Sequence, residues 1–187
     1  MPTSDTGRVP RAWKVVHWRL RSYDLGGMAL QAAEKTLHQI VSTVLRAVVR
    51  LMCEASGVHA CFAYLPDETG DRLVLRAASP PYERQAGKVV MERGEGLAWW
   101  AAERGEPAFI RDDALADPRT KYFPELEEEK FQSLLAVPVV GRSGDVIGVI
   151  TAHSEAPREF SDDEVDFLVT SAALVAGAIE NARLYED

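Results

Sequence analysis

Residues 133–153 read SLLAVPVVGRSGDVIGVITAH and decide the fold more than any other stretch of the chain. Two apolar runs rich in Val and Ile, residues 133–140 and 146–153, flank the turn sequence GRSGD. β-Branched residues favour strands, and a short glycine-containing connection between two such runs indicates a hairpin. The stretch therefore predicts two antiparallel strands in the core of a sheet.

A second hairpin is expected upstream. Residues 58–65 are apolar and aromatic, residues 72–78 alternate as a strand does, and the turn-forming sequence PDETGD joins them. Two further short strands are predicted at 88–92 and 107–111, with a helix over 96–104 that Gly105 ends. Residues 112–130 follow no regular pattern and carry two prolines and an acidic run.

Long helices are predicted at both ends of this β-rich region. From 28 to 56, apolar residues recur at steps of three and four, and Gly57 stands where a helix would stop. Residues 161–164 read SDDE, a capping box in which the Ser161 hydroxyl and the Glu164 carboxylate satisfy each other's backbone N–H groups. An amphipathic helix follows this signal.

The order of elements predicts an α+β fold. Hairpins build an antiparallel sheet, and two terminal helices with one apolar face each cover one side of it. Residues 94–131 remain to cover the other side, and we call them the covering segment. A long irregular segment inside a compact domain is usually functional.

Several short motifs, taken in order, resemble the GAF family of sensor domains. The resemblance extends over about residues 30–187 and rests on these pieces: GEGLA at 94–98, GEP at 105–107, DPR at 117–119, LLAVPVV at 134–140, VIGVI at 146–150, FSDDE at 160–164 and ENARLY at 180–185. It implies a PAS- or profilin-like antiparallel sheet of five or six strands with terminal helices on one face. The domain would span residues 28–187, after an N-terminal tail or extra segment at 1–27.

The family resemblance also implies a function. Members bind small molecules beneath the covering segment, and the form most similar to this chain is that of bacterial sensor histidine kinases, where the last helix leads to an output module. We therefore expect a non-catalytic sensor in a pathway of two-component type, with an unknown small molecule as ligand and an output protein as a further partner.

The sequence departs from the GAF types that carry a cofactor, so no cofactor is expected. Bilin-binding members use a cysteine in the covering segment, which has none here. Haem-binding members have a histidine just after a Phe-Pro pair, where this chain has Glu125 after Phe123 and Pro124. The cyclic-nucleotide signature is absent after Phe131. GEGLAW at 94–99 is similar to a dinucleotide loop, but Trp99 takes the place of its third glycine and no βαβ unit follows.

The candidate ligand-binding residues are aromatic side chains that cluster in the covering segment, together with one histidine at the end of a core strand: Trp99, Phe109, Tyr122, Phe123, Phe131 and His153. Aromatic walls with a few polar groups are typical of a ligand pocket. The same rings could equally seal the sheet as a filled core, because pocket and core differ only in the volume left open. His153 has a structural alternative as well.

Charge and cysteine content limit the classes of partner. The net charge is −8, and because residues 1–24 carry a net +3, the remainder carries −11. An acidic body disfavours nucleic-acid binding. No apolar run reaches the ~20 residues that a bilayer crossing needs, and no secretion signal is evident. A cytoplasmic protein without a membrane partner is expected, with Cys53 and Cys61 as buried, unreactive thiols.

The first helix carries more apolar surface than one sheet face can cover. Its apolar positions are Leu30, Leu37, Ile40, Val41, Val44, Leu45, Val48, Val49, Leu51 and Met52. A stripe this wide predicts a homodimer through the terminal helices. A ligand-free dimerisation or protein-interaction module is thus the alternative to a sensor. An enzyme is disfavoured, because the sequence shows no nucleophile–base pair or metal cluster.

Overall fold

A computed structural model of the chain describes residues 27–184, and the predicted N-terminal segment lies outside this range apart from its last residue. The elements are α1 (Gly27–Ser56), β1 (Ala60–Pro66), β2 (Arg72–Ala78), β3 (Val90–Glu92), α2 (Gly96–Arg104), β4 (Ala108–Ile110), β5 (Ser133–Val140), β6 (Val146–Ser154) and α3 (Asp162–Leu184). Short 3₁₀ turns lie at Glu83–Gln85, Ala114–Ala116, Pro124–Leu126 and Glu128–Lys130. All predicted strands and helices are present, within one or two residues of their expected ends.

The six strands form one antiparallel sheet in the order β3-β2-β1-β6-β5-β4. The two predicted hairpins meet at its centre, where β1 pairs with β6 and Phe62 lies opposite Thr151. In the second hairpin, Leu134 lies opposite His153. The α+β class and the sheet predicted from the sequence are confirmed.

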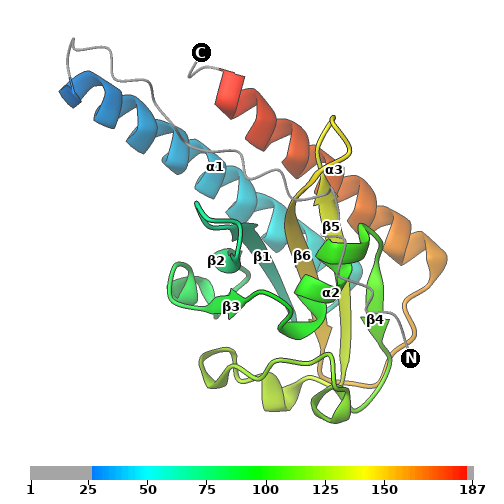
Figure 1. Cartoon of the computed structure of the whole chain (residues 1–187). Coiled ribbons are helices and arrows are strands. Elements are labelled where there is room, and N and C mark those ends of the chain that lie inside the picture. Colours follow the sequence, from blue (N-terminus) through cyan, green and yellow to red (C-terminus); the bar gives the residue numbers. More distant parts are fainter. Residues whose placement is uncertain (1–26, 185–187) are drawn as a thin grey trace, which may run out of the picture.

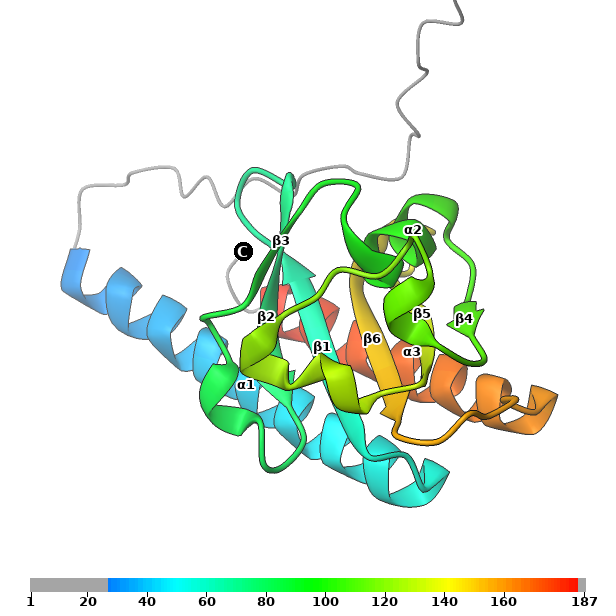
Figure 2. The same cartoon turned by 90° about the horizontal axis from the view of Figure 1, so that it is seen from below.

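The sheet separates two apolar layers, and Figures 1 and 2 show the helices and the covering segment on its two sides. Helices α1 and α3 lie side by side on one face, and α2 with the rest of the covering segment lies on the other. Side chains alternate along each central strand because the strand period is two residues. In β5, Leu135 and Val137 pack toward the long helices, whereas Leu134 and Ala136 pack toward the covering segment.

Local signals define the helix ends as predicted. The Ser161 hydroxyl accepts from the backbone N–H of Glu164 at 3.3 Å, and the Glu164 carboxylate accepts from the backbone N–H of Ser161 at 2.8 Å. Helix α2 ends at Gly105, whose φ of 67° is the left-handed conformation that glycine adopts readily. The capping box and the glycine stop therefore act as the sequence indicates.

Helix α3 is long and apolar enough over Asp162–Ala182 to cross a membrane, by length and composition alone. In the fold its apolar face is used differently. Leu168, Ala172 and Val175 are buried in the layer between the long helices and the sheet. Leu174 of the same helix is 70% exposed, so the fold covers only part of its apolar surface.

Candidate functional site

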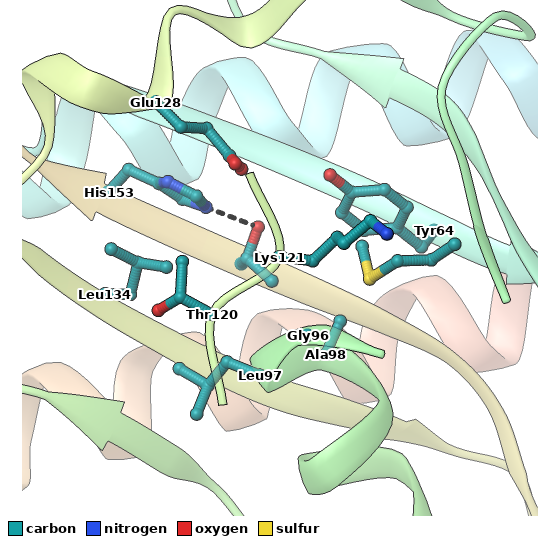
Figure 3. A pocket seen from close by; sticks show the side chains of 11 residues that line it. Tyr64, Gly96, Leu97, Ala98, Thr120, Lys121, Glu128, Leu134 and His153 are labelled. Carbon is teal, nitrogen blue, oxygen red and sulfur yellow. Dashed lines mark hydrogen bonds between the residues drawn. The ribbon is translucent and has the colours of Figure 1, made fainter. Parts of the chain in front are cut away.

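A small cavity lies between the sheet and the covering segment (Figure 3). Strands β1, β3, β5 and β6, the first turn of α2 and the loop between β4 and β5 all contribute to it. Its lining residues are Tyr64, Met91, Gly96, Leu97, Ala98, Thr120, Lys121, Glu128, Leu134, Thr151 and His153. The cavity has a volume of about 20 Å³. That volume suits one water, so a larger ligand requires the covering segment to move.

His153 is a deeply buried polar residue of the cavity, with 2% of its surface exposed. Its Nε2 lies 3.0 Å from the hydroxyl of Thr151, and its ring packs edge-on between Phe62 and Phe131, at centroid distances of 4.8 and 5.0 Å. Its Nδ1 is buried and has no hydrogen-bond partner among the described residues. Burial lowers the pKa of His153 to about 3, so the ring stays neutral at physiological pH.

Glu128 enters the cavity from the covering segment. Figure 3 shows its carboxyl group directed into the same space as the His153 ring. One carboxyl oxygen accepts the backbone N–H of Phe123 at 2.8 Å. Burial raises the pKa of Glu128 to about 8, with the nearby Glu129 and Glu125 adding to the shift. The cavity thus holds two buried polar groups that are mainly uncharged near neutral pH.

Helix α2 meets the cavity with its N-terminal turn, where backbone N–H groups have no partner within the helix. Lys121 stands beside this turn and pairs with Glu95 at 2.8 Å. Gly96 is required for this close approach: its φ is 76°, and an added Cβ would lie 2.7 Å from the sulfur of Met91. The side wall of the cavity therefore combines apolar contacts with backbone donors.

The structure gathers only part of the predicted set around the cavity. His153 lines it, and Phe131 supports His153 from behind, with 1% of its surface exposed. Trp99 is fully buried and donates its indole N–H to the carbonyl of Met91 at 3.2 Å, which makes it part of the core beneath the cavity wall. Phe123 is partly buried against the same layer.

Phe109 and Tyr122 lie away from the cavity. They are 40% and 46% exposed, and neither lines it. Phe109 belongs to the edge strand β4, where Ala108 and Ile110 point inward and Phe109 therefore points outward. The Tyr122 hydroxyl donates to Glu129 at 3.1 Å on the outer side of the covering segment.

Sequence reasoning missed Tyr64, Thr151 and Glu128. The strand period offered a signal for Thr151, which shares a face of β6 with His153. Glu128 carried none, because an acidic run such as 125–129 is typical of a solvated loop or helix face. The structure departs from that pattern at Glu128, of which only 7% is exposed. Among residues 27–184, no group of three His, Cys, Asp or Glu side chains is arranged to hold a metal ion.

The comparison with known families identifies the fold. Residues 34–180 match the family model described as GAF domain. The chain belongs to the GAF family. A GAF domain is generally a signalling or sensory domain, and the six-stranded antiparallel sheet with its helices matches the fold of a solved GAF domain.

One curated relative of this GAF domain is the phosphoenolpyruvate-dependent phosphotransferase system protein of Escherichia coli (strain K12). It is 27% identical over 144 residues, which are 77% of this chain but 19% of that protein. The chain thus spans about a fifth of the length of this relative. The resemblance concerns the GAF domain and leaves the activity of the larger protein open.

Solved structures of other proteins have the same fold as this chain. The GAF domain from a phosphoenolpyruvate-protein phosphotransferase of Coxiella burnetii is 30% identical with a TM-score of 0.71, covering 83% of this chain and 93% of that one. A type II free methionine-R-sulfoxide reductase from Thermoplasma acidophilum shares the fold at 22% identity and a TM-score of 0.64, covering 78% and 96%. The family is established, whereas the narrower likeness to sensor histidine kinases is not.

Proposed function

We propose that this GAF domain senses a small molecule that binds where His153 and Glu128 meet. The observation that carries the proposal is the buried Nδ1 of His153, which has no partner among the described residues. Leaving a buried polar atom unpaired costs about 1–3 kcal/mol. An apolar side chain would avoid that cost, so a histidine here is better explained by a guest that completes its hydrogen bonds.

The central strands supply a route from the cavity to the long helices. On β6, Thr151 and His153 face the cavity, while Ile150 and Ala152, which alternate with them, pack in the layer under α1 and α3. A shift of β6 on ligand binding therefore moves both faces of the sheet together. We infer that α1 and α3 pass the change to an output protein, in a cytoplasmic pathway of two-component type.

The proposed role is non-catalytic, although some proteins of this fold, such as methionine-R-sulfoxide reductases, are enzymes by name. The residues that line the cavity include no cysteine, and Cys53 and Cys61 contribute to the layer on the opposite face of the sheet. Cys61 is buried as expected, whereas Cys53 is only half-buried, against the expectation of two buried thiols. His153 is held neutral by burial, its Nε2 lies beside the Thr151 hydroxyl, and burial keeps the nearby Glu128 carboxyl mainly protonated near neutral pH. These features favour binding over turnover.

A thermal-shift screen of metabolites tests the proposal with two matched variants. Leu134→Phe adds volume into the cavity, whereas Leu115→Phe makes the same change at a residue that is 48% exposed. We expect at least one compound to raise the Tm of the wild type and of Leu115→Phe, and to lose its effect on Leu134→Phe. A compound that shifts all three proteins equally would place the binding site elsewhere.

A second candidate function, a dimerisation module, is favoured by apolar residues left exposed on the long helices. On α3, Leu174 is 70% exposed and shares a face with Phe167; on α1, Leu51 is 58% exposed and shares a face with Ile40 at 51%. A single chain buries only part of the predicted apolar stripe of α1. Leu45, Val49 and Met52 are buried, whereas Ile40 and Leu51 stay exposed. Leu30 and Leu37 lie outside the described side chains.

Sedimentation tests this dimer directly. We expect wild type to sediment as a dimer at micromolar concentration, and Leu174→Glu to shift it toward a monomer of 20.6 kDa. Leu115→Glu, a change at an exposed leucine of the covering segment, should leave the dimer intact. A wild-type monomer would remove the dimer from the account, while the ligand proposal would stand.

A further inference from the structure

The end of helix α3 is bonded to the turn between β5 and β6, which comprises residues 141–145. The backbone N–H of Arg142 donates to Oε1 of Glu180 at 2.7 Å, and the Arg142 guanidinium donates to the side-chain oxygen of Asn181 at 3.1 Å. The other carboxylate oxygen of Glu180 lies 3.4 Å from Nε of Arg142. We call the bond from the turn to this carboxylate the Glu180 contact.

The turn and the helix are fitted to each other at Gly141. A Cβ at this position would lie 2.5 Å from Oε1 of Glu180, so only glycine leaves the carboxylate its present place. The bond is charge-assisted, and such bonds are shorter and stronger than those between neutral groups. Because only 20% of the Glu180 side chain is exposed, water competes weakly for it.

Along the rest of its buried face, α3 packs on the sheet through apolar side chains. Those in the layer under the long helices are Leu168, Ala172, Val175 and Ile179. Apolar contacts are non-directional, and packed helices can shift by about 1–2 Å against each other. A hydrogen bond is directional and weakens steeply when its geometry changes. The Glu180 contact therefore determines the position of the end of α3 more strictly than the apolar packing does.

The two strands that the turn joins also reach the cavity, where Leu134 of β5 and Thr151 of β6 line the wall. We propose that the Glu180 contact makes the end of α3 follow the β5–β6 hairpin, so that a change in the cavity reaches this end of the helix. The inference rests on the proposed function only in taking a ligand as the natural cause of that change.

Hydrogen–deuterium exchange of the full chain tests the contact from both sides. Glu180→Ala removes the acceptor, and Gly141→Ala places a methyl group where the carboxylate lies. Each should make the backbone amides of residues 178–184 exchange about tenfold faster, as expected when one hydrogen bond to a charged group is lost. Asp166→Ala removes an exposed carboxylate from the same helix and should leave these amides unchanged.

The double variant decides whether the two substitutions break one and the same contact. Gly141→Ala should have no further effect in a chain that already carries Glu180→Ala, because the contact is then absent. Glu180→Gln keeps an oxygen that can accept the Arg142 N–H, and its exchange should stay close to that of the wild type. Effects that add in the double variant, or single variants that exchange like the wild type, would overturn the proposal.

Coupling to the cavity is measured by the same method. Leu134→Phe fills the cavity, and Thr151→Val changes its wall at nearly constant shape. At least one of them should alter the exchange of residues 178–184 relative to that of α1, and neither should do so in a chain with Glu180→Ala. An alteration that survives Glu180→Ala, or none in either cavity variant, would overturn the coupling. Neither result involves a ligand, so the outcome is separate from that of the thermal-shift screen.

Discussion

Replacing Glu128 with glutamine is expected to stabilise the fold by about 4 kcal/mol near pH 9, and by less than about 1 kcal/mol near pH 5. The carboxyl group has a pKa of about 8 in the fold and an ordinary value of 4.5. Because the pKa is raised on folding, its stability contribution is fully present below about pH 4.5 and is lost as the pH rises through 8. Glutamine removes this loss and can still accept the N–H of Phe123.

Urea unfolding of the wild type and of Glu128→Gln at pH 5 and at pH 9 measures this effect. The difference in free energy of unfolding between the two proteins is compared at the two pH values. Glu106→Gln is the matched control, because Glu106 is exposed on the covering segment and is not among the charges that shift the pKa of Glu128. It should change the free energy of unfolding by the same small amount at both pH values. A Glu128→Gln protein whose stability follows that of the wild type at every pH would show that Glu128 is solvated and not a wall of the cavity.

Phe131→Ala is expected to lower the free energy of unfolding by about 3–5 kcal/mol, a large part of the stability of an ordinary domain. The ring is 1% exposed and contacts His153 and Tyr82 edge-on. Phe109→Ala makes the same chemical change on a ring that is 40% exposed and lies beneath Arg111. Its loss should stay within about 1 kcal/mol.

Chemical denaturation of the two alanine variants at a single pH compares them. The two phenylalanines look alike in the sequence, since both belong to the aromatic cluster of the covering segment. Only the fold places the Phe131 ring in the core and the Phe109 ring at the surface. Equal losses would mean that β4 does not turn Phe109 outward as the structure has it.

The fold was predictable because its signals are local. Gly105 and the capping box at Ser161 define helix ends by backbone geometry, and the Val- and Ile-rich runs of β5 and β6 define strands by their period. The same signals place the long helices on one face, since both carry one apolar side. None of these inferences needed a contact between distant residues.

The site was predictable only in part, because it depends on contacts between distant residues. His153 could be found from its position at the end of a core strand. Alternation along β4 explains why Phe109 faces outward, although clustering of aromatic residues had suggested otherwise. The burial of Glu128 depends on how the covering segment packs on the sheet. The sequence around Glu128 does not show this packing.

Native mass spectrometry of the freshly purified chain tests the central claim most directly, because it reports bound small molecules and the number of subunits together. The account predicts wild-type protein with an added mass of a non-covalent ligand, the same added mass on Leu115→Phe, and none on Leu134→Phe. Two results together would contradict ligand sensing and favour the dimerisation module. One is wild-type protein that carries no added mass and has the same number of subunits as Leu134→Phe. The other is a screen in which no compound raises the Tm of the wild type.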